Sequence, residues 1–519
     1  MTIRAALVSV LLTSSCLAAQ GLDPATLLKP PTDNWPTYNG DYSGRRYSTL
    51  SSINRENVAR LGLRWTFQTH SQLKSTPLEV NGVLYFTAPD HIWAIDARTG
   101  HPVWQFDRPT TGNHIAQRGV AMYKDRLYFG TTDAHLLCLD ARSGKQIWDV
   151  QIADSKFGYY LSIAPLVVKD KLILGTSGDV ADVPHFIEAI SPIDGRVLWR
   201  FNTTPAPGQP GAETWPDREA LLHGGGPAWM PGTYDPELNL IYWGTGNPHP
   251  VLAGTTRAGD NLYTCSIVAL EADTGKLVWY FQPSPHDTHD WDAVETPVLF
   301  DAEFDGRPRK LLAQASRNGY FFLLDRTNGK NLLTAPFVPV DWAARISARG
   351  EPVPDKAKEP QPDGSLVRSF FDGATNWMAP SFDPQTGLFY VNAQTGFTLY
   401  YLELDRNGKP AGHQGGAANR FTSRFLLKAI DYQTGEIKWC VDQGPNEGAP
   451  GILTTAGNLL FTGDVSGNVL ALDPASGKIL WHMYTGANLS SSPMTYELGG
   501  RQYLLTLAGS VVYAWGVDN

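Results

Sequence analysis

Residues 282–297, QPSPHDTHDWDAVETP, form the densest group of chemically versatile side chains in the sequence. Two histidines and three aspartates fall within seven positions, between His286 and Asp292. Such side chains can bind a metal ion, transfer protons as general acids and bases, or shape a polar loop between strands. No third ligand follows at an interval typical of zinc, so zinc is the weaker of these interpretations.

Composition and charge narrow the fold class and exclude one class of partner. The 519 residues carry a net charge of −9, and no stripe of lysine and arginine argues for nucleic-acid binding. Amphipathic helical stretches are scarce after residue 65, whereas short apolar runs bounded by glycine, aspartate and asparagine predominate. This pattern predicts an all-β protein in which short strands are joined by turns.

The N-terminus has the pattern of a secretory signal peptide. Arg4 precedes an apolar run from Ala5 to Leu12, and small residues lead to a cleavage site expected near Ala19. A lipoprotein modified at Cys16 is the weaker alternative. No later apolar run approaches the ~20 residues of a membrane span. We therefore expect residues 1–19 to be a signal peptide and the remaining chain to be exported, in a bacterium to the periplasm.

The cysteines indicate neither a disulfide framework nor haem attachment. Cys138, Cys265 and Cys440 follow the signal peptide at scattered positions, and the sequence contains neither CxxC nor CxxCH. We therefore expect buried, unreactive cysteines in strands and a chain that carries no haem.

A phrase of about eleven residues recurs along the chain and specifies the architecture. In each copy a strand runs into a tight turn at a glycine, which supplies positive φ, and the following strand ends in tryptophan in all copies but one. A tryptophan at one fixed point of each repeat is expected to pack one sheet against its neighbour. The copies are AIDARTGHPVW (94–104), CLDARSGKQIW (138–148), AISPIDGRVLW (189–199), ALEADTGKLVW (269–279), LLDRTNGKNLL (323–333), AIDYQTGEIKW (429–439) and ALDPASGKILW (471–481).

Seven visible copies and one composite copy predict an eight-bladed β-propeller, a single domain over residues 20–519. The eighth sheet is assembled from both ends, with inner strands from residues 501–516 and an outer strand from residues 61–69. Joining the two ends closes the ring and removes the free edges of an open sheet. The long spacings at 191–271 and 325–431 predict loops over the central channel, and the HDTHDWD stretch directly follows the first of them.

An ordered series of motifs resembles the pyrroloquinoline quinone (PQQ)-dependent alcohol dehydrogenases of the methanol and ethanol dehydrogenase type. The resemblance covers nearly all of the chain after residue 19. It implies PQQ and Ca²⁺ as cofactors, an alcohol substrate, and a separate electron acceptor such as a cytochrome c or a quinone. The motifs are GGGPAW, YDPELNLIYWGTGNP, RAGDNLYT, SPHDTHDWDA, SRNGYFFLLDR and TTAGNLLFTGDVSG.

The resemblance assigns roles to the catalytic and metal-binding residues. Trp229 resembles the indole beneath the PQQ ring, and Asn247 resembles the amide ligand of Ca²⁺. Asp292 matches the general base, which also contacts the metal, and Arg317 matches the cation beside the quinone oxygens. Trp291 and the other polar residues of HDTHDWD are then expected to support the loop.

The remaining cofactor contacts also come from the resemblance. Arg118 matches an arginine that pairs with a PQQ carboxylate, and Ser162 matches a hydroxyl with the same task. Lys74 departs from the pattern, because methanol-type enzymes have a glutamate there, and it can hold a carboxylate together with Arg118. Asn376 matches an amide near the quinone oxygens. In GTSGDVADVPHF (175–186), Ser177, Gly178 and Asp179 match the stretch that reaches PQQ and the metal.

Several positions depart from the family pattern. Val180 stands where the family has a metal-binding glutamate, and Asp179 can replace it only if the loop is rebuilt. Gly112 and Asn113 replace the adjacent cysteines of many relatives, and Ala449 replaces an aromatic residue. Val294 stands where lanthanide-using relatives have a second aspartate, which argues against a lanthanide. These departures leave two interpretations, an alcohol dehydrogenase or a degenerate propeller that serves as a binding scaffold.

Overall fold

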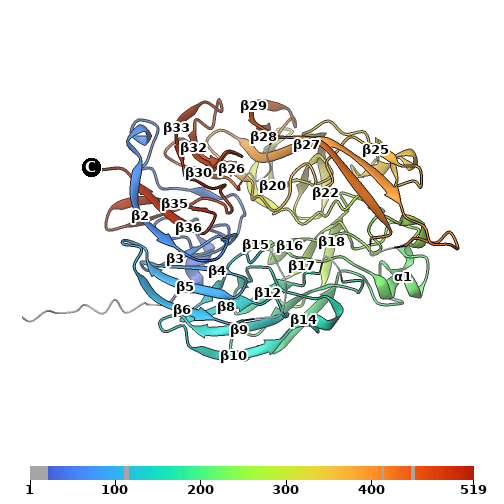
Figure 1. Cartoon of the computed structure of the whole chain (residues 1–519), viewed down its shortest axis with the longest axis horizontal. Coiled ribbons are helices and arrows are strands. Elements are labelled where there is room, and N and C mark those ends of the chain that lie inside the picture. The colour runs from blue at the N-terminus through green and yellow to red at the C-terminus, as the bar shows by residue number, and fades with distance from the viewer. Residues whose placement is uncertain (1–20, 110–115, 179–180, 412–413, 446–449, 519) are drawn as a thin grey trace, which may run out of the picture.

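The computed structural model describes residues 21–109, 116–178, 181–411, 414–445 and 450–518. Over these ranges, eight sheets follow one another around a central axis, each built on four antiparallel strands, as the colour order in Figure 1 shows. The first strand of each sheet lies toward the axis and the last forms the outer edge. The predicted eight-bladed β-propeller is therefore confirmed.

The strands follow the repeats, one hairpin after another, and we number the blades in chain order. Blade 1 comprises β3 (Leu78–Val80), β4 (Val83–Ala88), β5 (His91–Asp96) and β6 (Pro102–Asp107), and blade 2 comprises β7 (Ala121–Tyr123), β8 (Arg126–Gly130), β9 (His135–Asp140) and β10 (Gln146–Gln151). Blade 3 comprises β11 (Leu166–Val168), β12 (Lys171–Gly175), β13 (Phe186–Ile190) and β14 (Val197–Asn202), and blade 4 comprises β15 (Thr233–Asp235), β16 (Leu240–Gly244), β17 (Ile267–Glu271) and β18 (Leu277–Phe281).

Blade 5 comprises β19 (Val298–Phe304), β20 (Arg307–Ala315), β21 (Tyr320–Asp325) and β22 (Lys330–Pro336), and blade 6 comprises β26 (Ser381–Asp383), β27 (Leu388–Leu402), β28 (Gly416–Asp431) and β29 (Ile437–Gly444). Blade 7 comprises β30 (Leu453–Thr455), β31 (Leu459–Gly463), β32 (Asn468–Leu472) and β33 (Ile479–Tyr484), and blade 8 comprises β34 (Met494–Leu498), β35 (Arg501–Ala508), β36 (Val511–Gly516) and β2 (Gly62–Gln68).

Blade 8 joins the two ends of the chain. β2 pairs antiparallel with β36, in a register that runs from Gly62 opposite Gly516 to Gln68 opposite Val511. The N-terminal strand thus completes a sheet whose other three strands are C-terminal, as the sequence predicts. This pairing fastens the first and last parts of the ring by backbone hydrogen bonds.

The repeat tryptophans pack between blades. A Cβ added to Gly144 of blade 2 would lie 2.6 Å from the ring of Trp104 in blade 1, and Gly477 of blade 7 stands in the same relation to Trp439 of blade 6. These indoles therefore rest on the turn glycine of the next repeat, where no larger residue fits. The indole Nε1 of Trp104 also donates to the backbone carbonyl of Ala141 in blade 2. The tryptophans are architectural, as predicted.

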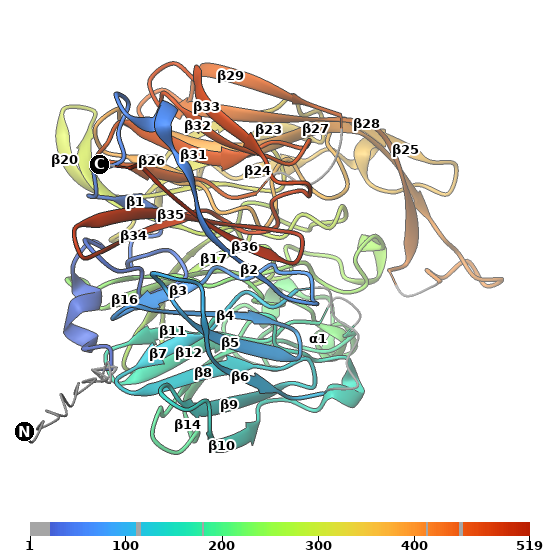
Figure 2. The same ribbon diagram turned by 60° about the vertical axis from the view of Figure 1, so that its left-hand side comes forward.

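Four features were not evident from the repeats. β1 (Tyr47–Ser48) adds to blade 7 by parallel pairing with β30. β25 (Ser365–Val367) extends blade 6 outward, because the β27–β28 hairpin is long and projects beyond the ring (Figure 2). Cys440 is exposed, although Cys138 and Cys265 are buried as expected. The remaining short elements are the β23 (Ala343–Ile346) and β24 (Pro352–Pro354) hairpin, α1 (Arg218–His223), and the 3₁₀ turns η1 (Pro24–Leu28), η2 (Val58–Arg60), η3 (Ser155–Phe157), η4 (Ala212–Thr214), η5 (Gly254–Thr256) and η6 (Lys356–Lys358).

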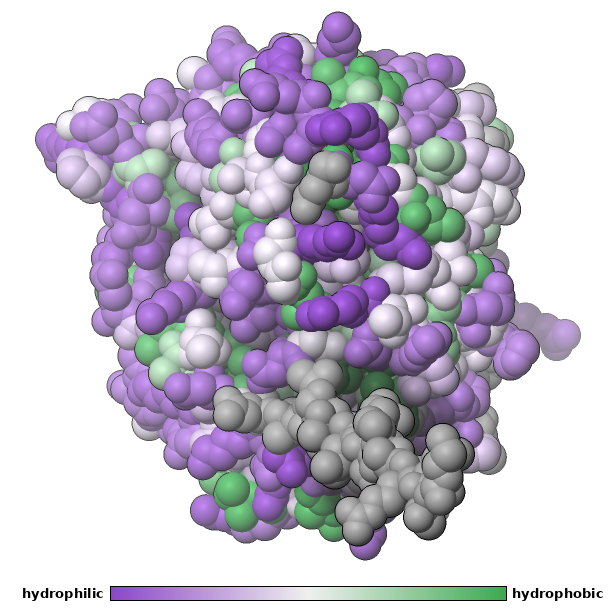
Figure 3. Space-filling view, turned by 90° about the vertical axis from the view of Figure 1, so that its left-hand side faces the viewer, coloured by the Kyte–Doolittle hydropathy of each residue, from purple (hydrophilic) through white to green (hydrophobic). Residues whose placement is uncertain are grey.

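The outer surface is polar, and its apolar groups are scattered in small areas on the face shown in Figure 3. Among the described residues, no helix is long and apolar enough to cross a bilayer. The buried side chains lie between and within the blades, where they form clusters such as the one that joins blades 1, 7 and 8.

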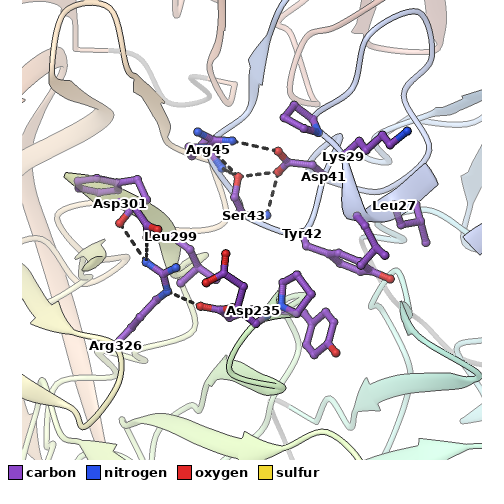
Figure 4. A pocket seen from close by; sticks show the side chains of 16 residues that line it. Leu27, Lys29, Asp41, Tyr42, Ser43, Arg45, Asp235, Leu299, Asp301 and Arg326 are labelled. Carbon is purple, nitrogen blue, oxygen red and sulfur yellow. Dashed lines mark hydrogen bonds and ion pairs between the residues drawn. The ribbon is translucent and has the colours of Figure 1, made fainter. Parts of the chain in front are cut away.

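A cavity of about 330 Å³ separates the N-terminal segment from blades 4 and 5 (Figure 4). Five of its seven charged residues pair with one another. Arg326 lies 2.7 Å from Asp235 and 2.6 Å from Asp301, while Arg45 and Asp41 form a second ion pair. Because these charges are already satisfied, the cavity serves as the seam where the N-terminal segment docks.

Candidate active site

A second cavity, of about 300 Å³, lies at the mouth of the channel and gathers most of the predicted site residues. Strand ends and loops of blades 2 to 6 supply its walls. Predicted residues in the lining are Arg118, Ser162, Trp229, Asn247, Asp292, Arg317 and Asn376, and further ones are Ala116, Tyr160, Val251, Asp290, Asp372, Trp377 and Gln414.

Asp292 is held from three sides. Its Oδ2 accepts a hydrogen bond of 2.7 Å from the indole Nε1 of Trp229, and its Oδ1 accepts one of 2.8 Å from the backbone N–H of Asn247. The guanidinium of Arg317 lies 3.3 Å from Oδ2. The side chain is only 4% exposed, so this carboxylate is oriented and largely shielded from water.

Asp290 lies in the same cavity, although the sequence assigned it to loop support. Its side chain is 20% exposed, more than that of Asp292, and its Oδ2 lies 3.4 Å from Arg317. Asp290 has a positive φ of 68°, which an aspartate tolerates better than most residues. No periodic pattern in the sequence predicts a positive φ at one residue. The spacing of the acidic residues therefore could not place the Asp290 carboxylate beside Asp292.

The side chains of Asn247, Asp290 and Asp292 converge beside the cavity. One terminal atom of the Asn247 amide lies 2.9 Å from Oδ1 of Asp292 and 3.3 Å from Oδ1 of Asp290. With its nitrogen turned inward, the amide donates to both carboxylates. With its oxygen turned inward, three oxygens face one point and require a cation between them. Carboxylate and amide oxygens are the ligands that hard cations prefer, so these residues fit a metal ion.

Arg317 carries the positive charge of this wall. Although burial lowers the pKa of its guanidinium, the carboxylates of Asp290, Asp292 and Glu295 raise it above the usual range of arginine. The cation is therefore permanent and lies within contact distance of both aspartates. It can stabilise negative charge that develops on a reacting oxygen nearby.

The opposite wall is aromatic and cationic. The guanidinium of Arg118 lies over the ring of Trp229, 4.9 Å from its centroid, and 5.7 Å from the centroid of Trp377. Lys74 belongs to an adjoining cavity rather than this one. Burial and the neighbouring Arg118 lower the pKa of the Lys74 ammonium. Two cations and two indoles thus form a surface suited to a flat anionic ring.

Of the predicted blade 3 residues, Ser162 lines the cavity, whereas Ser177 and Gly178 do not. The hydroxyls of Ser162 and Ser177 are 3.0 Å apart and buried, and the carbonyl of Ser162 accepts from the backbone N–H of Arg118. Gly178 follows Ser177, and an added Cβ there would meet His185. Ser177 therefore supports Ser162 from behind the cavity wall.

The Asn376 amide is fixed by its own loop. Its Nδ2 donates to the carbonyl of Asp372 at 2.7 Å, and its Oδ1 accepts from the backbone N–H of Trp377 at 2.8 Å. The positions that carry the main departures lie outside the described residues. They are Gly112, Asn113, Asp179, Val180 and Ala449.

The acidic loop is shaped by Asp287. Its carboxylate accepts from the backbone N–H groups of His289, Asp290 and Trp291 at 3.3, 3.0 and 3.2 Å. The buried guanidinium of Arg257 donates to the carbonyl of Asp287. Asp287 is thus a loop-supporting residue, as predicted, and it sets the position of the two aspartates that follow.

The histidines of this loop bind backbone carbonyls rather than a metal. A ring nitrogen of His286 bonds the carbonyl of Gly259, and His289 bonds that of Lys358. Trp291 is fully buried and stacks on His289 with centroids 4.4 Å apart, which is the packing role expected for it. Over the described ranges, no three histidine, cysteine or acidic side chains are grouped as a metal site, so zinc is not supported.

Comparison with known proteins identifies the family. The model of the PQQ glucose/ethanol/alcohol dehydrogenase β-propeller domain matches residues 35–363 and 426–504. The chain belongs to the quinoprotein alcohol dehydrogenase family. It is 36% identical to the quinoprotein alcohol dehydrogenase PedH of Pseudomonas putida, over 91% of this chain and 84% of that protein. It is also 36% identical to the quinohemoprotein alcohol dehydrogenase of Comamonas testosteroni, over 93% and 73%.

Solved structures of this quinoprotein family have the same fold. The quinohemoprotein alcohol dehydrogenase of Comamonas testosteroni superposes with a TM-score of 0.88 at 32% identity, over 96% of this chain and 83% of that chain. A europium-containing methanol dehydrogenase gives 0.85 at 28% identity, over 95% and 99%.

The comparisons correct the expected cofactor set of PQQ and Ca²⁺ without haem. Three relatives from 33 to 36% identical are named quinohemoprotein alcohol dehydrogenases. The absence of CxxCH describes only this chain's own residues, and it did not justify excluding haem. PQQ itself agrees with the family model.

Proposed function

We propose that the chain is an exported quinoprotein dehydrogenase that oxidises an alcohol, with PQQ supplying the quinone carbonyl that accepts a hydride. The observation that carries this proposal is the meeting of Asp290, Asp292, Arg317 and Trp229 in one cavity. Carboxylates for proton transfer, a permanent cation and an aromatic floor are the parts that such an oxidation requires.

We propose that the cationic wall holds the carboxylates of the cofactor. Arg118 is the cation of this wall that lines the cavity, and the Ser162 hydroxyl adds a hydrogen bond. Trp229 provides the stacking surface, and Arg118, which now lies over that ring, would have to move aside to pair with a carboxylate. Asn376 is fixed by two backbone hydrogen bonds and offers its amide edge to the same cavity.

The two aspartates divide the chemical work. Asp292 is held by three donors and is nearly closed to water, which suits a carboxylate that fixes Arg317 and contributes to cation binding. Asp290 is more exposed and faces the cavity, which suits the acceptor of the alcohol proton. The sequence assigned that role to Asp292, and the exposure difference makes Asp290 the stronger candidate.

We propose that a hard cation is held by Asn247, Asp290 and Asp292. Two carboxylates around one ion suit Ca²⁺. They favour a trivalent lanthanide still more, because the attraction of each negative ligand increases with the charge of the ion. Europium in a related methanol dehydrogenase is consistent with the second choice. Asp290 thus provides the second carboxylate that appeared to be missing at Val294.

The scaffold interpretation is the weaker one. A propeller that had lost its chemistry would have no need to keep two aspartates, an arginine and an asparagine in mutual contact inside a cavity. We also propose that the reduced site passes electrons to a separate acceptor such as a haem protein.

Reconstitution tests the function. The purified chain is mixed with PQQ and either Ca²⁺ or La³⁺, and dye-linked oxidation of primary alcohols is followed. We expect turnover that requires both PQQ and a cation, and calorimetric binding of PQQ. If PQQ neither binds nor supports turnover with either cation, the enzyme proposal is wrong and the scaffold interpretation takes its place.

A further inference from the structure

Beside the active-site cavity lies a larger one, of about 670 Å³. The two share Asp372, Asn376 and Trp377, so they adjoin along one wall. The larger cavity continues toward blades 7, 8 and 1. Its other lining residues include Gln72, Lys74, Gln394, Arg420, Asn488 and Ser490.

Three hydrogen-bond donors of the larger cavity have no protein acceptor. The side chain of Gln394 is 95% buried by residue exposure, yet its Nε2 bonds no atom of the described residues. The buried hydroxyl of Ser490 is likewise unsatisfied within those ranges. The ammonium of Lys74 forms neither an ion pair nor a hydrogen bond with the part of the chain that the structure describes. Buried donors without acceptors are costly, so those of Gln394 and Ser490 indicate a ligand that bears acceptor oxygens. The half-buried Lys74 adds a positive charge beside them.

The two cavities differ in charge. In the smaller cavity the acid pair Asp290 and Asp292 offsets the cations Arg118 and Arg317. In the larger one, Arg420 pairs with Asp372 at 3.1 Å, which leaves the charge of Lys74 in excess. An alcohol with an anionic far end would therefore place its hydroxyl at the acid pair and its anion at Lys74.

We propose that the larger cavity is a carboxylate subsite in which Lys74, Gln394 and Ser490 bind the acidic end of an elongated substrate, such as a hydroxy acid. This rests on the proposed alcohol oxidation. A carboxylate of PQQ has the same chemistry and is the second source that the experiment must separate. A carboxylate matches the three donors, because its two oxygens can accept from an ammonium, an amide and a hydroxyl together.

Matched substrates test the subsite in the reconstituted holoenzyme. The ratio of kcat/KM for 6-hydroxyhexanoate to that for 1-hexanol is measured in the wild type and in Gln394→Leu, Lys74→Met and Lys330→Met. Lys330 lies exposed on β22 and is the control. We expect the ratio to fall roughly tenfold in the first two variants, which lose a hydrogen bond to a charged group, and to stay constant in the control.

Direct binding separates the sources and does not depend on turnover. Hexanoate and PQQ are each titrated into the chain by calorimetry. Weaker hexanoate binding in Gln394→Leu and Lys74→Met, with PQQ affinity retained in Gln394→Leu, assigns the subsite to the substrate. If both variants lose PQQ affinity while the kcat/KM ratio of the two substrates stays unchanged, the subsite binds the cofactor and the proposal is wrong. If hexanoate does not bind, or if neither variant changes either affinity or the ratio, the proposal is wrong even where alcohols are oxidised.

Discussion

The indole Nε1 of Trp229 donates a 2.7 Å hydrogen bond to Oδ2 of Asp292. Trp229 precedes the first strand of blade 4, and Asp292 precedes that of blade 5. The bond therefore joins the aromatic floor of the cavity to its acidic wall across a blade boundary. A change in the angle between these blades would shift the floor and the carboxylate together.

The acid pair can be resolved by separate substitutions. Asp290→Asn should lower kcat by roughly 10²–10⁴-fold at every cation concentration, because it removes the proton acceptor. Asp292→Asn should raise the cation concentration needed for half-maximal rate and recover part of its kcat at high cation concentration. Steady-state rates over a cation series check this, with the exposed Asp363→Asn as control. The reverse pattern would return the base to Asp292.

The cation site can be observed without turnover. Terbium(III) bound near Trp229 should emit when the indole is excited, because Asp292 contacts both the proposed ion site and Trp229. Asn247→Leu removes one oxygen ligand and should weaken the affinity by roughly tenfold or more. Displacement by Ca²⁺ and by La³⁺ then ranks the two ions. The surface variant Asn419→Leu is the control and should keep the wild-type affinity. An equally unchanged affinity in Asn247→Leu would place the ion elsewhere.

The blade-to-blade contact of the repeats can be measured with two glycines of like backbone. Gly477 has φ of 71° and faces the ring of Trp439, whereas Gly408 has φ of 75° and has open space around an added Cβ. Gly408→Ala should cost about 1 kcal/mol from backbone strain alone. Gly477→Ala should cost about 2–4 kcal/mol, because the methyl group overlaps the indole. Denaturant unfolding compares them, and equal costs would refute the docking role.

A buried carboxyl in blade 1 should make stability depend on pH. Burial raises the pKa of Glu79 to about 8, although a hydrogen bond from the backbone of Gly82 lowers it. The folded state therefore holds this proton more tightly than the unfolded chain. The resulting stabilisation is complete below about pH 4.5 and is lost as pH rises through about 8, on the order of 4 kcal/mol.

Urea unfolding at about pH 5 and pH 9 measures this loss. Glu79→Gln keeps an acceptor for the Gly82 N–H but cannot ionise. It should therefore show a much smaller decrease between the two pH values. An equal decrease in both proteins would mean that another group is responsible.

The sequence predicted the architecture well because the repeat is a local signal. The turn glycine and the tryptophan of each copy specify one hairpin and one docking contact, as Gly144 and Trp104 illustrate. The parallel addition of β1 to blade 7 follows no such signal, because two residues pair with a strand some four hundred positions away. Only the folded ring brings those segments together.

The candidate site was predicted in part. Arg118, Trp229 and Arg317 were placed by motifs and do meet in the cavity. Asp290 was assigned to the loop, because its orientation depends on a positive φ and on the hydrogen bonds of Asp287. Lys74 lies in the neighbouring cavity, since it comes from blade 1 and the catalytic wall from blades 4 to 6.

Blade 8 ties the order of synthesis to the order of folding. β2 is among the first strands made, yet its only ladder partner is β36, the last strand of the described chain. During synthesis β2 lacks its partner strand while the other blades leave the ribosome. The ring can close only after β36, the last of its strands, has left the ribosome.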